Sequence, residues 1–287
     1  MQAAVLWRAT RAYSLPASVV PVLLGTVLAA RGYGAGNGHG PFSGLIFVVV
    51  LLGAILAHFG ANVLNDYFDF VKGVDTRPEH GSGVLTRGEM TPRYALIYAL
   101  AFLTGAALCG LFLLRTNPTV IISLALIGLA CAVLYPALLK RFGFGDLLII
   151  IAFGAGLTLG AYAVQAGAVS VDAALRVVGY SLPICLLVDA ILHANNLRDA
   201  RDDRAARVRT LATMLPPKTA QLLQQFLLFG PLLFVIAGVS LRLLPVVSLI
   251  TLAAFPLLLR AARTGSVEGT AQTHLAFGLL YTAAFLF

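Results

Sequence analysis

The stretch ANVLNDYFDF at residues 61–70 ends a long apolar run with a cluster of amide and acidic side chains. A second stretch, ANNLRDARDD at residues 194–203, ends another apolar run, and Ala, Asn, Leu, Asp and Asp occupy the same offsets in both. An ionised side chain at the centre of a bilayer costs at least about 2.5–3.5 kcal/mol, so neither cluster is expected to face lipid. The two stretches therefore predict a polar site enclosed by membrane-spanning helices.

The apolar runs that lead into these clusters belong to a pattern that covers the whole chain. Of the 287 residues, 59% are hydrophobic and 11% are charged, whereas a soluble domain carries about 25% charged residues. A spanning helix needs about 17–25 apolar residues, so the stretches with few or no charges predict nine transmembrane helices. These stretches are 12–30, 32–65, 94–114, 116–139, 147–171, 177–197, 219–241, 243–259 and 269–287. We expect an all-α polytopic membrane protein with a single domain over residues 1–287, because helices satisfy their backbone hydrogen bonds internally.

The distribution of Lys and Arg predicts the orientation in the membrane. If the N-terminus is cytoplasmic, 16 of the 20 basic residues lie on the cytoplasmic side. The four on the other side are Arg31, Arg115, Arg176 and Arg242. Because Lys and Arg favour cytoplasmic loops, we expect a cytoplasmic N-terminus and a location in the cell membrane. The net charge of +8 is then a topology signal, and without a soluble basic domain the chain is not predicted to bind nucleic acid.

Helical periodicity groups the polar residues of each cluster into a stripe, because residues three or four apart share one helix face. The first helix presents His58, Asn62, Asn65 with Asp66, and Asp69. The second presents Asp189, His193, Asn196, Asp199 and Asp203. Since neither stripe is expected to face lipid, we expect the two to face each other across a central cavity open to the cytoplasm.

Two acidic clusters that share a cavity concentrate negative charge and require cations. Carboxylate and amide oxygens suit Mg²⁺, which binds through one or two carboxylates plus substrate phosphates. A diphosphate is the expected ligand, because metal ions and basic side chains would neutralise its negative charge as it leaves the substrate. The basic candidates are Lys72, Arg77, Arg87, Lys140 and Arg141. Apolar walls would hold a lipid tail, so the expected reaction joins an allylic lipid to an aromatic ring.

The two motifs resemble those of a known family. NDYFDFVKGVD at 65–75 resembles the first Asp-rich motif of the UbiA-type intramembrane prenyltransferases, and NNLRDARDD at 195–203 resembles the second. LYPALLKRF at 134–142 is similar to the basic segment after the fourth helix of that family. Among subfamilies the chain most resembles 1,4-dihydroxy-2-naphthoate polyprenyltransferases of menaquinone biosynthesis. HANN and DDRAARVRTLA also resemble the 4-hydroxybenzoate branch.

The resemblance implies roles for individual residues. Mg²⁺ and the diphosphate would be held by Asn65, Asp66, Asp69, Asp199 and Asp203, with Asn195 and Asn196 assisting. The diphosphate would also contact Lys140, with Arg141, Lys72 and Arg87 as further candidates. The expected acceptor pocket contains Asn62, Asp189, His193, Asn196 and Arg11. A self-satisfied structural pair remains an equal alternative for Asp189 with His193, as does a topology role for Arg11. The expected partners are a polyprenyl diphosphate, an aromatic acceptor and membrane lipid, with the oligomeric state open.

Two other functions fit parts of the pattern. A secondary transporter would also place acids in a membrane, although its acids usually lie near the midplane on broken helices in matching halves. Here the acids lie at helix ends and are followed by loops, which favours an enzyme. A CDP-alcohol phosphotransferase would carry acidic metal ligands as well, but the DGxxAR signature of that family is missing from this chain.

Overall fold

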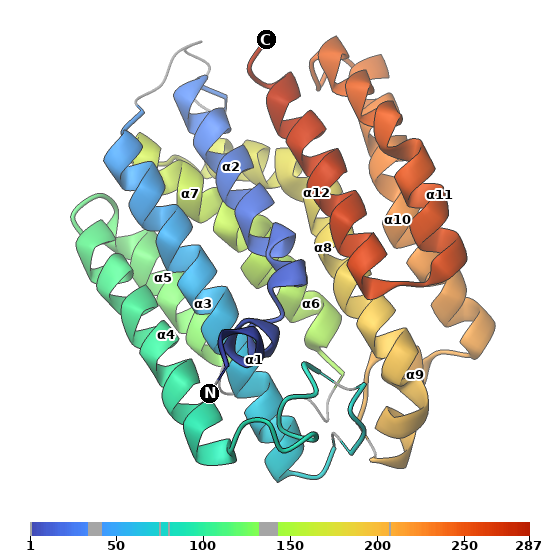
Figure 1. Cartoon of the computed structure of the whole chain (residues 1–287). Helices are drawn as coiled ribbons and strands as arrows, with labels where there is room; N and C mark the ends of the chain where they lie inside the picture. The colour runs from blue at the N-terminus through green and yellow to red at the C-terminus, as the bar shows by residue number, and fades with distance from the viewer. Residues whose placement is uncertain (1, 34–41, 75, 80, 132–142, 207) are drawn as a thin grey trace.

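All regular secondary structure in the described part of the chain is helical, which confirms the predicted all-α class. The computed structural model describes residues 2–33, 42–74, 76–79, 81–131, 143–206 and 208–287, and no strand occurs among them. The helices are α1 (Ala3–Ala9), η1 (Ala12–Ser14), α2 (Pro16–Ala30), α3 (Gly44–Val71), α4 (Pro92–Leu113), α5 (Pro118–Leu129), α6 (Gly145–Ile149), η4 (Ile150–Gly156), α7 (Leu157–Ala166), α8 (Val171–Ala205), α9 (Leu211–Met214), α10 (Pro217–Ser240), η5 (Val246–Ala254), α11 (Phe255–Thr264) and α12 (Val267–Ala284). The long helices lie side by side along roughly one axis and form a bundle (Figure 1).

Polar side chains fix where five of the long helices begin. Ser43, Thr91, Asn117, Ser170 and Ser266 precede α3, α4, α5, α8 and α12, and each side chain accepts a hydrogen bond from the N–H three residues on. Such caps satisfy backbone donors that the helix itself leaves unpaired. The apolar runs therefore become helices with defined starting points.

Seven helices in the described part of the chain are long and apolar enough to cross a membrane. They are Ala12–Ala30, Gly44–Val71, Pro92–Leu113, Gly145–Ala166, Val171–Ala205, Pro217–Ser240 and Val246–Thr264. The other two predicted spans contain α5, with 12 residues, and α12, with 18. The helices thus indicate a multi-pass membrane protein, while nine spans and a cytoplasmic N-terminus stay predictions.

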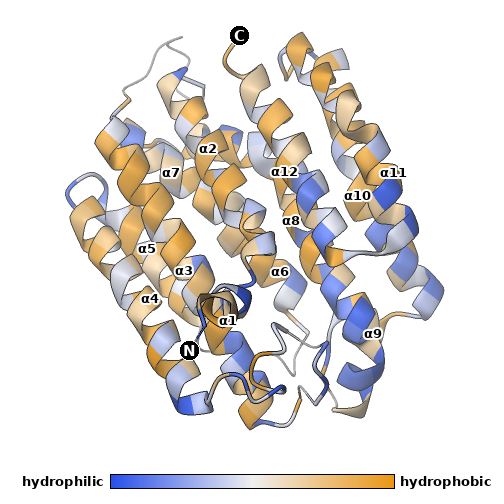
Figure 2. Ribbon diagram, viewed as in Figure 1, coloured by the Kyte–Doolittle hydropathy of each residue, from blue (hydrophilic) through white to orange (hydrophobic). Residues whose placement is uncertain are grey.

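The outside of the bundle is apolar. In the most apolar part of α4 only 11% of the residues are buried, and in α3 only 22%. Side chains such as Leu108 and Leu111 are each 62% exposed. Orange ribbon covers most of the length of these helices, and hydrophilic residues gather toward the lower end (Figure 2). This distribution is what a lipid environment requires of the outer helices.

The core lies where α2, α8, α10 and α12 pack together. Leu24, Ile184, Leu228 and Phe277 are each fully buried there. Protein interiors are close-packed, so this core holds α8 in a fixed place relative to α2. The two helices that carry the acidic clusters, α3 and α8, both end at the lower side of the molecule in Figure 1, and the segment after α3 runs between them.

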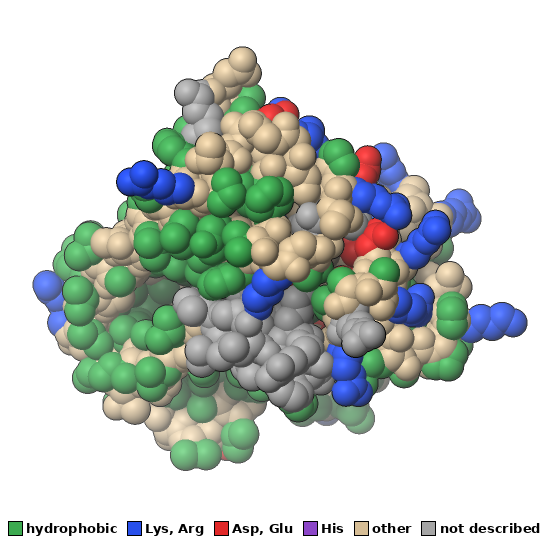
Figure 3. Space-filling model, turned by 90° about the horizontal axis from the view of Figure 1, so that it is seen from below, with side chains coloured by type: hydrophobic (Ala, Val, Ile, Leu, Met, Phe, Trp, Pro, Cys, Tyr) green, Lys and Arg blue, Asp and Glu red, His purple; other side chains and the backbone are tan. Residues whose placement is uncertain are grey.

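Many charged side chains gather at the lower end of the molecule. Seen from below, acidic side chains lie among several Lys and Arg side chains (Figure 3). The concentration of charge at one end of the bundle matches the position of the two clusters at the ends of α3 and α8. A site for charged ligands is therefore expected at the ends of α3 and α8.

Candidate active site between the ends of two helices

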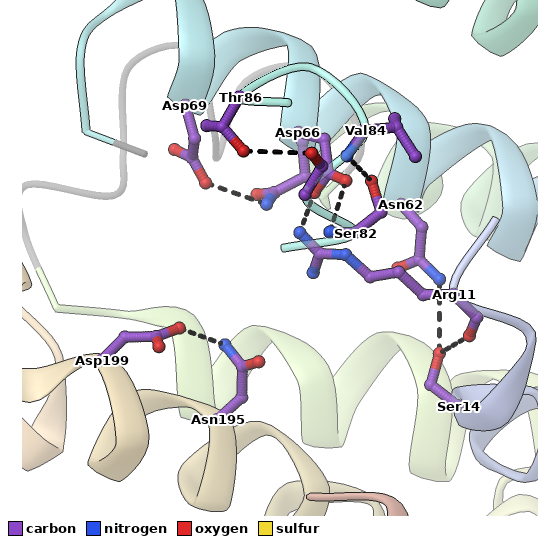
Figure 4. Close-up of polar contacts among 12 residues, drawn as sticks. Arg11, Ser14, Asn62, Asp66, Asp69, Ser82, Val84, Thr86, Asn195 and Asp199 are labelled. Carbon is purple, nitrogen blue, oxygen red and sulfur yellow. Dashed lines mark hydrogen bonds and ion pairs between the residues drawn. The ribbon is translucent and has the colours of Figure 1, made fainter. Parts of the chain in front are cut away.

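A small pocket lies between the C-terminal ends of α3 and α8. Its lining residues are Arg11, Asn65, Asp69, Val74, Gly81, Asn195, Asn196, Asp199, Asp202 and Asp203. Four carboxylates from two helices and one arginine thus border one space. The lower parts of the two polar stripes face each other as the sequence predicts, and Figure 4 shows Asp69 and Asp199 on opposite sides of the opening between them.

On the α3 side, Asn65 and Asp69 line the pocket together. They are four residues apart and therefore share a helix face, and Asn65 Nδ2 donates a hydrogen bond to Asp69 Oδ2 at 2.9 Å. The helix ends just beyond them, where Gly73 has a φ of 68° and Val74 N donates to Asp69 O at 2.8 Å. The chain thus turns back over the carboxylate and brings Val74 to the pocket wall.

Asp66 has a different environment from that of Asp69. One carboxylate oxygen forms an ion pair with Arg11, and the other accepts a hydrogen bond from Ser82 N at 2.9 Å. The side chains of Asp66 and Arg11 are only 7% and 12% exposed. Both oxygens of Asp66 therefore have protein partners, one of them a cation, and Asp66 is not among the described residues that line the pocket.

Gly81 allows this close approach. Its φ is +57°, which L side chains rarely adopt, and a Cβ there would lie 2.5 Å from Arg11 Nη2 and 2.6 Å from Asp66 Oδ1. Glycine lacks the Cβ that would clash and tolerates this conformation. In the sequence, the GSG run at residues 81–83 is the signal for the turn that presents Ser82 N.

On the α8 side, Asp199 is bound by residues of its own helix. Arg198 donates to both carboxylate oxygens at 2.7 Å, and Asn195 Nδ2 donates to Oδ2 at 3.3 Å. Arg198 also donates to Asn195 Oδ1 at 2.8 Å. Arginine presents this planar fork to carboxylates. Asp203, one turn further, is buried and borders the same pocket.

An ion pair connects the two sides of the site. Arg77, in the segment after α3, lies with one Nη 3.0 Å from Asp202 Oδ1 on α8. Asp202 also lines the pocket. The side chain of Arg77 is 52% exposed, so this contact lies at the outer edge of the site. The contact gives Asp202, a pocket residue, a partner from the segment that follows α3.

The predicted diphosphate-binding cations have mixed positions. Lys140 and Arg141 lie outside the described residues. Arg87 donates to Pro78 O at 3.0 Å and to Ser82 O at 2.8 Å, so it ties together the segment that follows α3. Lys72 lies 5.7 Å above the ring of Phe68 at the end of α3. Arg11 is the cation that borders the pocket among the described residues.

The upper parts of the two stripes diverge from the pocket. Asn62 Nδ2 donates to Thr10 O at 2.9 Å, and both ring nitrogens of His58 lie 2.8 Å from serine hydroxyls of the segment at residues 14–18. Of the predicted acceptor residues, Arg11 and Asn196 border the pocket, whereas Asn62 is not among the described residues that line it. The acceptor role of Asn62 stays a prediction.

Asp189 and His193 face another part of the molecule. His193 Nε2 lies 2.9 Å from Ala220 O on α10, and Nδ1 lies 3.5 Å from Asp146 Oδ1 at the start of α6. All three side chains are buried. The sequence analysis missed Asp146, although an isolated acid at the head of an apolar run was a signal for it. His193 therefore contacts Asp146 and α10 in place of the expected partner Asp189, and the acceptor role of Asp189 and His193 stays a prediction.

The donor set of the pocket suits a hard divalent cation. Carboxylate and amide oxygens are the ligands that Mg²⁺ prefers, usually one or two carboxylates together with water and phosphate oxygens. Among the residues that the structure describes, no three His, Cys, Asp or Glu side chains converge to hold a metal ion. The pocket therefore fits a cation that is shared between carboxylates on each side and an anionic substrate.

Comparison with known proteins gives consistent matches. A model of the UbiA prenyltransferase family matches residues 18–283. A Drosophila melanogaster protein, the UbiA prenyltransferase domain-containing protein 1 homolog, is 35% identical over 96% of this chain and 77% of its own length. The 1,4-dihydroxy-2-naphthoate octaprenyltransferase of Bacillus subtilis is 32% identical over 75% of this chain and 67% of its own. A UbiA homolog from Archaeoglobus fulgidus, solved with GPP and Mg²⁺, has the same fold, with a TM-score of 0.66, 14% identity and 98% of each chain covered.

Proposed function

Because this chain belongs to the UbiA prenyltransferase family, we propose that it transfers the prenyl group of a prenyl diphosphate to an aromatic acceptor with the help of Mg²⁺. Membership of this family confirms the predicted enzyme class, a prenyltransferase. It also favours this class over the alternative of a secondary transporter. We further propose that residues 1–287 act as one prenyltransferase domain. The observation that carries the proposal is the pocket bordered by carboxylates of both α3 and α8.

The proposed ligands of Mg²⁺ are the side chains that border the pocket. Asn65 and Asp69 would contribute from α3, and Asp199 and Asp203 from α8. When bound, Mg²⁺ would supply positive charge to the diphosphate as it leaves. The solved relative that holds both GPP and Mg²⁺ supports this pairing of ligands. Asp66 is also a predicted ligand. Its contribution would be to hold Arg11 by an ion pair and Ser82 N by a hydrogen bond beside the pocket.

The residues of the chain would bind and orient the two substrates. Arg11 would place its guanidinium against an anionic oxygen inside the pocket, and the predicted partners Lys140 and Arg141 would bind the diphosphate. The prenyl tail would lie along the apolar helices. In the transfer, the allylic C–O bond breaks, the diphosphate keeps the electron pair, and a ring carbon of the acceptor forms the new C–C bond. Stabilising the developing diphosphate charge is the largest contribution expected of the site.

For the acceptor we propose 1,4-dihydroxy-2-naphthoate. The spacing from Asn65 through Lys72 to Asp75 resembles the naphthoate branch, and the Bacillus subtilis relative with that activity in its name supports the choice. This acceptor would gain the prenyl group and lose its carboxylate as carbon dioxide, giving a demethylmenaquinol-type lipid, the reduced form of demethylmenaquinone. The alternative is 4-hydroxybenzoate, which the HANN and DDRAARVRTLA runs favour.

We also propose that the enzyme lies in the cell membrane with its site toward the cytoplasm. The support is the concentration of Lys and Arg on the side that carries the ends of α3 and α8. Prenyl diphosphates are charged, so a site at the membrane surface gives the diphosphate access to water while the tail stays in lipid.

The test uses the purified full chain in lipid nanodiscs with geranyl diphosphate, Mg²⁺ and a panel of aromatic acids. We expect a prenylated product, identified by mass, to form fastest from 1,4-dihydroxy-2-naphthoate and to disappear when EDTA removes Mg²⁺. The matched comparison uses 4-hydroxybenzoate and homogentisate with the same donor. Faster turnover of 4-hydroxybenzoate would reject the acceptor assignment, and no product with any acid would reject the proposed function.

A further inference from the structure

The segment that carries Arg11 has an unusual backbone. Arg11 has a φ of 49° and a ψ of 47°, a left-handed conformation that non-glycine residues rarely adopt. It lies between α1 and η1, and its backbone N donates to Arg8 O at 3.0 Å. Such a conformation persists where the surrounding structure holds it, and it is often found at functional sites. The contacts that hold Arg11 therefore matter for the pocket that its side chain borders.

Two side chains hold the backbone on either side of this turn. Asn62 Nδ2, from α3, donates to Thr10 O at 2.9 Å and to Ser14 Oγ at 3.3 Å. Ser14 Oγ donates to Arg11 O at 2.8 Å. The carbonyl groups of the two consecutive residues, Thr10 and Arg11, are thereby fixed by side-chain donors. The turn is tied to α3, the helix that also carries Asp66 and Asp69.

His58 completes the network, and its hydrogen bond to Ser14 has a defined donor and acceptor. Ser14 Oγ uses its proton on Arg11 O, so it must accept from His58 Nε2, which lies 2.8 Å away. On the other side of the ring, Nδ1 lies 2.8 Å from Ser18 Oγ. A continuous chain of hydrogen bonds thus runs from Ser18 through His58 and Ser14 to Arg11. His58 is 4% exposed, and both of its ring nitrogens have the hydrogen-bond partners that buried polar atoms require.

The network reaches the pocket through Arg11 alone among these residues. Arg11 borders the pocket and pairs with Asp66, whereas His58, Ser14 and Asn62 are not among the described residues that line it. Figure 4 shows Ser14 and Asn62 beside the backbone of Arg11, with its side chain extending toward Asp66. Arg11 is therefore the direct link between these three side chains and the pocket.

We propose that His58, Asn62 and Ser14 are positioning residues that set the guanidinium of Arg11 for an anionic oxygen of a substrate. The inference rests on the proposed function, because that function brings anionic groups to the pocket. The oxygen belongs either to the donor diphosphate or to the acceptor carboxylate, which share the same chemistry toward arginine. The Michaelis constants of the two substrates distinguish these sources.

The kinetic test compares variants that each remove one side chain of the network. Ser14→Ala and Asn62→Ala remove the ties to the turn, while Ser14→Thr keeps the hydroxyl. Ser181→Ala is the matched control, because its buried hydroxyl donates to Val178 O at 2.8 Å on α8, away from the turn. The KM for geranyl diphosphate and the KM for the best acceptor are measured with Mg²⁺ in each variant, and Ser14→Ala is repeated in an Arg11→Ala background.

We expect Ser14→Ala and Asn62→Ala to raise, about fivefold, the KM of the same substrate that Arg11→Ala affects, a change that corresponds to the net contribution of about one neutral hydrogen bond. Ser14→Thr should restore the wild-type value, and Ser181→Ala should leave it unchanged. In the Arg11→Ala background, Ser14→Ala should have no further effect, because coupled residues are not additive. Unchanged KM values in Ser14→Ala, or a full additional effect in the double variant, would overturn the proposal.

A second readout does not depend on turnover. Phenylglyoxal modification of Arg11, mapped by mass spectrometry, should be slow in the wild type, where its side chain is 12% exposed. It should be faster in Ser14→Ala and Asn62→Ala, and unchanged in Ser181→Ala. Equal protection in all variants would reject the positioning role. A failure of the proposed function alone would show as no prenylated product with altered Arg11 labelling still present.

Discussion

The two acidic clusters have the same residues at the same offsets, but the structure uses them differently. Asp66 and Asp199 occupy equivalent offsets in the two stretches. Asp199 borders the pocket and is bound by Arg198 of its own helix, whereas Asp66 is buried and pairs with Arg11 from a distant part of the chain. Asp69 and its counterpart Asp202 both border the pocket. The comparison indicates that α8 supplies most of the pocket carboxylates, while α3 divides its acids between the pocket and the N-terminal segment.

The largest expected effect comes from the pocket carboxylates of both helices. We expect Asp69→Ala and Asp199→Ala each to lower turnover by about 10²–10³-fold, the cost of removing one electrostatic contact to a developing charge. Turnover at saturating Mg²⁺ is the measurement, with the melting temperature as a control for folding. Near-normal turnover in either variant would show that one helix suffices and would break the two-helix account.

The two clusters should also differ in how much a substitution at Asp66 or at Asp199 lowers the stability of the protein. Asp66→Asn would leave the buried Arg11 without its counter-charge, so we expect a loss of about 3–5 kcal/mol in the free energy of unfolding. In Asp199→Asn, Arg198 can turn toward water because its side chain is 32% exposed, and stability should change little. Thermal unfolding of the two variants in the same detergent measures the difference. Equal losses in both would remove the distinction drawn between the clusters.

The turn above Asp66 gives a smaller effect. Gly81→Ala would force a side chain into a left-handed conformation, at a cost of about 1–2 kcal/mol, and would press on Arg11 and Asp66. We expect reduced stability and weaker donor binding. Gly88→Ala is the matched control, since Gly88 is also left-handed, with a φ of 69°, and has no neighbour within 4 Å of its ideal Cβ. If both variants lose activity equally, the close approach at Gly81 has no special role.

The smallest effect is expected at the outer edge of the site. Arg77→Ala removes the contact to Asp202, but Arg77 is 52% exposed, and exposed ion pairs contribute less than about 1 kcal/mol. We expect turnover within about twofold of the wild type at moderate salt. A loss as large as that of Asp199→Ala would mean that the contact between the two sides is essential to the site.

The sequence predicted the all-α class, the multi-pass membrane character and the meeting of the two clusters, because apolar runs and helical periodicity are local properties. It did not predict the division of roles between Asp66 and Asp69. Asn65 and Asp66 are neighbours, and both lie within one turn of Asp69, so spacing alone cannot say which of them faces the pocket. The partners that decide this, Arg11 and Ser82 N, come from segments whose approach depends on tertiary packing.

The upper stripe residues show the same limit of local patterns. His58 and Asp189 were placed on faces toward a common cavity, but His58 contacts the segment at residues 14–18 and Asp189 lies in a buried region with Asp146 and His193. Periodicity identified the polar face of each helix correctly. The neighbour that each polar face meets was set by the packing of α2, α6 and α10, which no motif encodes.

The central claim is that α3 and α8 together bind Mg²⁺ and a prenyl diphosphate in the pocket between their ends. The most direct measurement is calorimetric binding of geranyl diphosphate to the full chain, with and without Mg²⁺, in the wild type and in Asp69→Asn and Asp199→Asn. We expect Mg²⁺-dependent binding in the wild type and a loss of at least about tenfold in affinity in both variants. Binding that does not require Mg²⁺, or that survives unchanged in either variant, would contradict the account.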